Sequence, residues 1–136
     1  MIGVLVVCHG DLAEGFKQAV GLIVGERESF STIGLFEGDS IDDLPRKIVA
    51  EVKKLDTGEG VLIFVDLLGA SPFNATVKAV SQLHDRKLDM ITGANLPMVL
   101  EALMQREGEI DLAQLSVSVA EAGKKQIRTL SEMMGE

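Results

Sequence analysis

The chain contains neither tryptophan nor tyrosine, and it has a single cysteine, Cys8. One cysteine excludes an internal disulfide, and it gives no support for a thiolate metal cluster or a redox pair. A secreted protein stapled by disulfides is therefore excluded. A reducing, cytoplasmic environment is expected.

Positive charge is also scarce. Thirteen Lys and Arg residues stand against 21 Asp and Glu residues, so the formal net charge is −8. Nucleic acids and anionic membranes present negative charge, which argues against both as partners and favours a basic protein. No apolar run reaches bilayer-spanning length, and the amino terminus lacks the basic region and cleavage site of a signal peptide. We therefore expect a soluble protein.

What the chain does have is a regular alternation of short apolar runs and longer amphipathic runs. Its 136 residues, 46% of them hydrophobic, suffice for one domain with its own core. The alternation predicts βα units around a mostly parallel sheet covered on both faces. The predicted strands are residues 2–8, 31–36, 60–65 and 88–92, and the predicted helices are residues 12–24, 42–55, 71–83 and 95–107.

The segment Leu115–Val119 has a different pattern, because its apolar residues alternate with Ser116 and Ser118. Strict alternation is typical of a strand with one solvated face. We therefore predict a fifth, C-terminal edge strand here, antiparallel to the others, followed by a helix over residues 120–133. The predicted fold class is thus α/β, an open doubly wound sheet of four parallel strands plus this edge strand. An open edge invites pairing with another chain, and we predict its exchange in a dimer.

Three polar residues follow the ends of predicted elements at one edge of this sheet. His9 follows the first strand and Asp66 follows the third, while Ser71 is predicted to cap the next helix with Pro72 at the first helical position. The first and third strands of a doubly wound sheet are commonly neighbours. Asp66 is therefore expected within reach of His9.

This arrangement favours phosphoryl transfer. A carboxylate that accepts the proton of one imidazole nitrogen leaves the other nitrogen with a lone pair, so His9 is the candidate nucleophile and Asp66 its partner. The backbone N–H groups of Gly69, Ala70 and Ser71, with the Ser71 hydroxyl, suit phosphoryl oxygens at a helix N-terminus. Two simpler alternatives stay open: a surface histidine in a turn, and a serine that only caps a helix.

Other polar residues are assigned no role in this chemistry. Cys8 precedes His9 in the strand and points to the opposite face, so it is expected in the core. His84 lies in a polar helix end and is expected in solvent. The turn after the first strand lacks G-x-G-x-x-G spacing, which argues against a dinucleotide site. We predict neither a metal site nor a cofactor.

The motifs also resemble a known family. The strand that ends at His9–Gly10 is followed by V-D-L-L-G-A-S-P-F-N at residues 65–74 and by G-A-N-L-P-M at residues 93–98. Together these segments resemble the mannose-class IIA component of the bacterial phosphoenolpyruvate-dependent sugar phosphotransferase system (PTS), in order and over nearly the whole chain. The most specific of them is the run D-x-x-G-[GA]-S-P-F-N.

The resemblance implies one IIA phosphoryl-carrier domain over residues 1–136. In it His9 would be transiently phosphorylated, Asp66 would be its partner carboxylate and Ser71 would assist the phosphoryl group. The histidine phosphocarrier protein HPr would donate phosphate and a IIB component would accept it, so that the membrane IIC and IID components are reached only indirectly. IIA itself binds no sugar. The family also implies a homodimer with an exchanged edge strand.

The sequence departs from the family at two positions and leaves two rival hypotheses. Ala70 stands where many members have glycine, and Leu68 where some have an aromatic residue. A receiver domain would place its phosphoacceptor at Asp66, but it needs an acidic pair after the first strand, where this chain has His9. A dihydroxyacetone-kinase-type IIA regulatory module would share the fold, although its pattern departs from the S-P-F-N found here.

Overall fold

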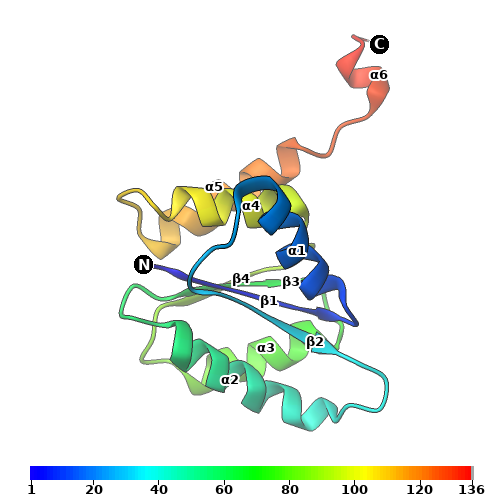
Figure 1. Cartoon of the computed structure of the whole chain (residues 1–136). Helices are drawn as coiled ribbons and strands as arrows, with labels where there is room; N and C mark the ends of the chain where they lie inside the picture. Colours follow the sequence, from blue (N-terminus) through cyan, green and yellow to red (C-terminus); the bar gives the residue numbers. More distant parts are fainter. Residues whose placement is uncertain (136) are drawn as a thin grey trace.

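The computed structural model describes residues 1–135, in which eleven elements follow one another along the chain (Figure 1). In order they are β1 (Gly3–His9), α1 (Leu12–Val24), β2 (Phe30–Leu35), the 3₁₀ turn η1 (Ile41–Asp43), α2 (Leu44–Leu55), β3 (Val61–Val65), α3 (Ser71–Gln82), β4 (Leu88–Ile91), α4 (Leu96–Gln105), α5 (Leu112–Lys125) and α6 (Leu130–Met133). The four predicted strands and the four helices that follow them are confirmed, with bounds shifted by at most two residues.

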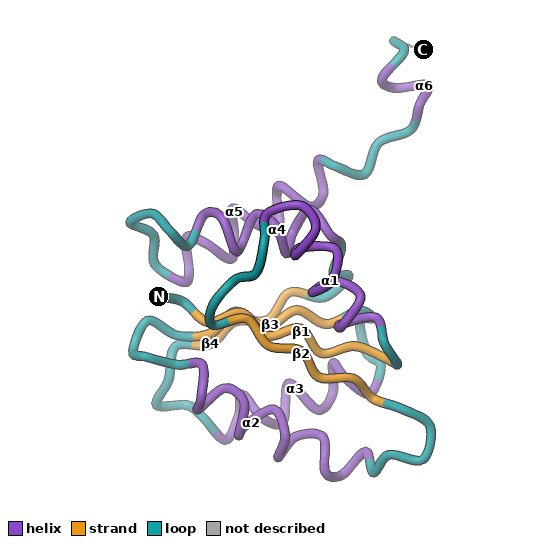
Figure 2. The backbone as a smooth tube through the Cα atoms, viewed as in Figure 1, coloured by secondary structure: helices purple, strands orange, loops and turns teal. Residues whose placement is uncertain are grey.

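The strands of the described residues form one four-stranded sheet (Figure 2). Their order is β2-β1-β3-β4, and every neighbouring pair is parallel. The chain steps from β1 to one side to form β2, and then crosses to the other side of β1 to form β3. The order therefore reverses between β1 and β3, and such a switch point is where open α/β sheets place their ligands. The prediction that the first and third strands are neighbours is confirmed.

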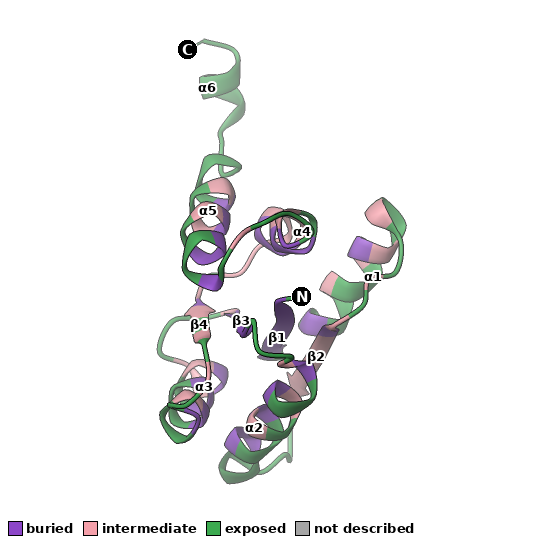
Figure 3. Ribbon diagram, turned by 90° about the vertical axis from the view of Figure 1, so that its left-hand side faces the viewer, coloured by how far each residue is buried: buried purple, intermediate pink, exposed green. Residues whose placement is uncertain are grey.

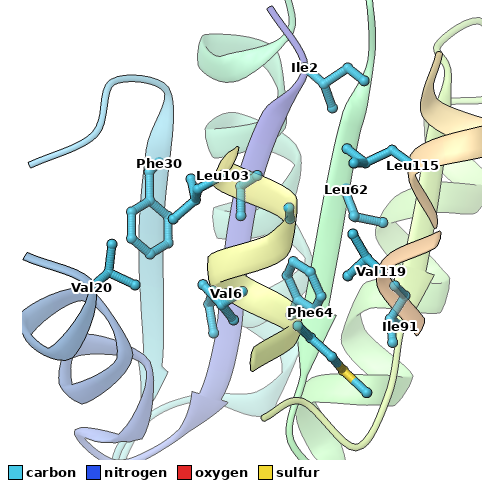
Figure 4. Close-up of a cluster of buried hydrophobic side chains, with 14 of the residues drawn as sticks. Ile2, Val6, Val20, Phe30, Leu62, Phe64, Ile91, Leu103, Leu115 and Val119 are labelled. Carbon is cyan, nitrogen blue, oxygen red and sulfur yellow. The ribbon is translucent and has the colours of Figure 1, made fainter. Parts of the chain in front are cut away.

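Helices cover both faces of the sheet, as the doubly wound prediction requires (Figure 3). On one face Val6, Leu62 and Phe64 pack under α1, α4 and α5 (Figure 4). On the other, Leu5 and Ile63 pack under α2 and α3. Because neighbouring strand residues point to opposite faces, the unbroken apolar runs of β1 and β3 fill both cores at once. This double burial fixes the two central strands whose ends carry the candidate site.

The predicted edge strand at Leu115–Val119 is wrong, because these residues lie in α5. Asp111 starts this helix with a capping box: its carboxylate accepts the Gln114 N–H, and the Gln114 side chain accepts the Asp111 N–H. Leu115 and Val119 are four residues apart and therefore share one helix face, where they pack beside Leu62 and Ile91 (Figure 4). Five residues are too few to distinguish the alternation of a strand from the four-residue spacing of a helix face.

The chain leaves the layered body after α5. Residues 126–129 and α6 project away from the sheet and helices (Figure 1). Ile127 and Leu130 in this segment are 73% and 70% exposed, and Met133 and Met134 are exposed as well. The predicted helix over residues 120–133 is therefore two helices, the end of α5 and the short α6, with an extended link between them. We call residues 126–135 the tail.

Candidate active site

His9 is the last residue of β1, at the switch point. It pairs with Leu35 of β2, and beyond it the Gly10 N–H donates to the Leu35 carbonyl over 2.8 Å. Its neighbours in the strand are buried, whereas the side chain of His9 is 46% exposed. The sequence therefore carries an imidazole on a rigid central strand out to the carboxyl edge, where another molecule has access to it.

Asp66 follows β3 and holds His9 from the side. Its Oδ2 accepts the backbone N–H of His9 and lies 2.8 Å from Nδ1 of the imidazole, while its Oδ1 accepts the Leu67 N–H over 2.9 Å. The Asp66 side chain is only 9% exposed. The expected proximity of Asp66 to His9 is confirmed, and one carboxylate orients both the backbone and the ring of His9.

The protonation state of Asp66 follows from these contacts. Burial by itself raises the pKa of the Asp66 carboxyl, but the hydrogen bonds from the His9 N–H, the His9 ring and the Leu67 N–H outweigh it and leave the pKa below its ordinary value. Asp66 is thus an ionised, acceptor-only group at neutral pH. Its Oδ2 requires a proton on Nδ1 of His9, and so the neutral imidazole carries its lone pair on the outer Nε2.

The turn between β3 and α3 brings Gly69, Ala70 and Ser71 to the same edge of the sheet. Gly69 has φ +81°, a left-handed conformation suited to glycine. The predicted serine cap is wrong: Ala70 is the N-cap, and Ser71 is the first helical residue. Since its hydroxyl is not used for capping, Ser71 is available for another partner. Pro72, with no N–H to offer, follows at the second helical position.

Sequence reasoning assigned no role to Asn74, which braces this turn. Its side-chain amide donates to the Gly69 carbonyl over 3.1 Å, and its backbone N–H donates to the Ala70 carbonyl over 2.9 Å. The signal was present, since Asn74 closes the S-P-F-N run. An amide five residues after a left-handed glycine locks the turn whose N–H groups begin α3.

The remaining candidates lie where the sequence places them. Cys8 is fully buried, and burial first, then the nearby Asp66 charge, raise the pKa of its thiol to about 12. It stays a neutral core residue. His84 is exposed in the turn between α3 and β4, at the opposite edge of the sheet.

Within residues 1–135, no three His, Cys, Asp or Glu side chains are grouped so as to hold a metal ion. In the same range, no helix combines the length and the apolar character that crossing a bilayer requires.

The fold and the site define a class of protein. It is an open, doubly wound α/β protein with an imidazole–carboxylate pair at the topological switch point of its sheet. The chain belongs to the EIIA-man family, described as "PTS system fructose IIA component", which matches residues 3–120. It is therefore an EIIA component of the mannose family of the sugar phosphotransferase system, as the resemblance predicts.

Individual relatives agree with this assignment. The chain is 33% identical over 129 residues to the mannose-specific EIIAB component of Escherichia coli, covering 95% of this chain but 39% of that protein. It is 35% identical over 107 residues to the fructose-specific EIIA component of Bacillus subtilis, covering 79% of this chain and 72% of that one. The chain thus spans well under half of the EIIAB relatives and most of the EIIA relative.

Solved structures share the fold. The EIIA structure from Streptococcus agalactiae has a TM-score of 0.90 at 28% identity and covers 97% of this chain and 99% of its own. The mannose/sorbose-specific IIA subunit from Enterococcus faecalis has a TM-score of 0.81 at 23% identity, covering 95% and 94%, and supports the fold alone. The parallel sheet with helices on both faces is common to all three.

Proposed function

We propose that this chain is a phosphoryl carrier that accepts phosphate from HPr on Nε2 of His9 and passes it to a IIB component for sugar uptake and phosphorylation. The observation that carries the proposal is the 2.8 Å contact between Nδ1 of His9 and Oδ2 of Asp66. The Nε2 lone pair attacks phosphorus while the N–P bond of the donor phosphohistidine breaks. Asp66 holds the Nδ1 proton and balances the positive charge of the ring. Residues 1–136 act as one IIA domain in the cytoplasm.

Phosphate oxygens would be held by the turn before α3. The backbone N–H groups of Gly69, Ala70 and Ser71 and the hydroxyl of Ser71 lie in this turn, and α3 adds the positive end of its dipole. A group of this kind stabilises the charge on a transferring phosphoryl group. We therefore propose these three residues as the phosphate-binding group beside the nucleophile His9.

The surface around His9 supports protein partners. Large apolar side chains are exposed in the segments that leave the carboxyl ends of the three strands β1, β2 and β3: Leu12, Phe36, Leu67 and Leu68. A net charge of −8 favours a basic partner. A basic protein with an apolar patch around its own phosphohistidine fits this surface, and HPr and IIB would use it in turn. The membrane IIC and IID components are then served through IIB.

We also propose that the chain works as a homodimer, with the exchanged segment moved from Leu115–Val119 to the tail. The outer edge of β4 is open, and a hollow of about 340 Å³ lies between the start of β4 at Leu88 and the start of α5 at Leu112. A second hollow of about 230 Å³ lies on the other side of β4, between Val77 and Met90. The exposed apolar tail of one copy is suited to pair with β4 of a second copy and to fill both hollows.

Phosphorylation in a purified system tests the carrier function. With phosphoenolpyruvate, enzyme I and HPr, the chain is expected to take up one acid-labile phosphate. His9→Ala should take up none, and His84→Ala, which removes the only other histidine, should behave as wild type. An acid-stable label, or a label that survives His9→Ala, contradicts the proposal.

Two additions separate the rival functions. Protein loaded from purified phospho-HPr in the presence of a chelator should still accept phosphate, whereas a receiver domain needs a magnesium ion. A mannose-family IIB component should then remove the label from His9. A label that stays on His9 in the presence of IIB would favour the dihydroxyacetone-kinase-type regulatory module.

A further inference from the structure

The strand beside His9 carries a glycine in an unusual contact. Gly34 lies in β2, opposite Cys8 in the β1–β2 register, and the next pair is His9 with Leu35. The ladder then continues through the Gly10 N–H, which donates to the Leu35 carbonyl over 2.8 Å. The backbone around His9 is therefore held from two sides, by Asp66 on the side of β3 and by Leu35 on the side of β2.

The space beside Gly34 is already filled. A Cβ atom on Gly34 would lie 2.5 Å from the carbonyl oxygen of Gly10, and 2.8 and 3.0 Å from Cε2 and Cζ of the Phe36 ring. All three distances are at or below the closest approach that real side chains make. The ring can rotate away, but the Gly10 oxygen belongs to the backbone and moves only with the turn that follows His9.

Backbone freedom does not explain a glycine at this position. Gly34 sits within the regular pairing of β2, and it is not among the glycines with positive φ. A glycine inside a strand weakens it, and it often marks a place where another backbone approaches closely. Here the backbone that approaches is Gly10, one residue from the imidazole.

We propose that Gly34 is a positioning residue for His9: its missing side chain lets the Gly10 turn lie against β2, which fixes His9 in register with Asp66. The proposal rests on the proposed function of His9. A side chain at residue 34 would push the Gly10 carbonyl outward, strain the bond from Gly10 to Leu35 and pull the imidazole away from Asp66 Oδ2. The Phe36 ring, folded over Gly34, closes the outer side of the same contact.

The substitution Gly34→Ala tests this proposal through the tautomer of His9. In wild-type protein the ionised Asp66 holds the proton on Nδ1, which ¹⁵N spectra of the imidazole report directly. In Gly34→Ala we expect a measurable population with the proton on Nε2, together with a phosphoryl-transfer rate from HPr that is lower by about 10- to 100-fold. His84, at the far edge of the sheet, serves as an internal reference whose spectrum should not change.

A matched control is available in α1. Among the described residues, nothing lies within 4 Å of a Cβ placed on Gly21, so Gly21→Ala adds the same methyl group without a contact. Its His9 tautomer and transfer rate should equal those of wild type. The double variant Gly34→Ala/Phe36→Ala removes the ring but keeps the contact with Gly10, and it should keep the altered His9 tautomer. Only the tautomer is compared in this variant, because Phe36 also belongs to the proposed partner surface. If Gly34→Ala does not fold, the His9 tautomer is measured in the double variant, which lacks the two close contacts with the Phe36 ring.

The outcomes separate this proposal from the carrier function. The tautomer is measured without phosphate, so a wild-type His9 that takes no label contradicts the carrier function and leaves the tautomer test standing. A Gly34→Ala protein that is folded, with the wild-type His9 tautomer and transfer rate, overturns the positioning role. A wild-type His9 tautomer in the double variant also overturns it, because the Phe36 ring rather than the Gly10 turn would then be responsible.

Discussion

At the scale of single residues, the carboxylate of Asp66 connects structure and chemistry. The same Oδ2 atom accepts the backbone N–H and faces the ring nitrogen of His9, so the residue that fixes the end of β1 also fixes the tautomer. Because the Asp66 side chain is nearly buried, its negative charge acts on the imidazole through little water. The geometry and the charge of Asp66 make separate contributions to the proposed phosphoryl transfer, and the substitution Asp66→Asn distinguishes them.

Asp66→Asn is expected to keep the fold, since an amide oxygen still accepts the His9 N–H, but to slow phosphoryl transfer. An amide has no charge to balance the cationic ring, and with its oxygen at the Oδ2 position its NH₂ group faces the Leu67 N–H, which loses its acceptor. We expect a loss of about 100-fold or more, as for other carboxylate–histidine pairs. Quenched-flow measurement of transfer from phospho-HPr checks this, and an unchanged rate would remove Asp66 from the site.

A second buried carboxylate, Asp56, controls stability in acid. It accepts hydrogen bonds from the N–H groups of Gly58 and Gly60 and from Arg86. Burial alone raises the pKa of Asp56, but these bonds outweigh it and hold the pKa below its ordinary value. A carboxyl with a lowered folded-state pKa stabilises the fold above its unfolded pKa, about 3.9, and loses that effect as the pH falls through the folded value.

The lowered pKa of Asp56 predicts how the stability of the Asp56→Asn variant depends on pH. The variant should have a lower free energy of unfolding than wild type at pH 7, and the difference should shrink below about pH 4 as wild-type Asp56 takes up its proton. Urea unfolding at several pH values measures the difference. Asp85→Asn, at an exposed acid in the turn after α3, is the control and should show no such convergence. A difference that stays constant down to pH 2 contradicts this account.

How much of the site could be predicted differs from residue to residue. The proximity of His9 and Asp66 could be predicted because strand ends are readable from apolar runs, and the ends of parallel strands share an edge. Ser71 was misplaced by one position, because a serine before a proline has the pattern of a cap while Ala70 takes that place. Gly34 could not be found, since its constraint comes from Gly10, which is distant in sequence and adjacent only in the folded sheet.

At the scale of elements, α5 shows why short alternation is a weak signal. Leu115, Val117 and Val119 alternate like a strand, yet Leu115 and Val119 also share a helix face, and Val117 is exposed on the other side. The stronger signal was Asp111 followed three residues later by Gln114, a capping box that starts a helix. Strands β1 and β3 were predictable because a continuous apolar run of five residues leaves no such ambiguity. Strands β2 and β4 include polar residues such as Thr32 and Asp89, and they were predicted from their place between helical patterns.

The capping box of α5 therefore contributes to stability. Asp111→Ala should lower the free energy of unfolding by about 1 kcal/mol, because the Gln114 N–H loses its acceptor at the start of the helix. Urea denaturation at pH 7 measures this loss, with Asp85→Ala as the control for removing an exposed acid. Equal stabilities of the two variants would mean that the cap is not needed.

At the scale of the whole molecule, the layered body and the tail contrast with each other. The body buries the central strands from both faces, whereas the tail exposes four large apolar side chains, and β4 keeps an open edge. Monomeric proteins rarely leave both an open strand edge and an apolar segment uncovered. The proposed homodimer would cover the two at once.

Removal of residues 126–136 is expected to give a folded monomer, because both cores and the cap of α5 lie before this point. In the full chain, Ile127→Asp with Leu130→Asp should also give a monomer, since two charges would have to enter the hollows beside β4. Leu22→Asp, at a residue of α1 that is 90% exposed, is the matched control and should leave the dimer intact. Sedimentation at low micromolar concentration decides, and a monomeric wild-type chain contradicts the exchange.

The distance in sequence between His9 and Asp66 has a consequence for newly made protein. The two residues are 57 positions apart, and their strands pair only after β2 and α2 have been made. At about 5–20 residues per second, a ribosome adds those residues in roughly 3–11 s. During that interval a nascent chain displays a histidine without its carboxylate. Under the proposed carrier function, charging with phosphate would begin only once the β1–β3 pair has formed, and unfinished chains would draw no phosphate from the donor.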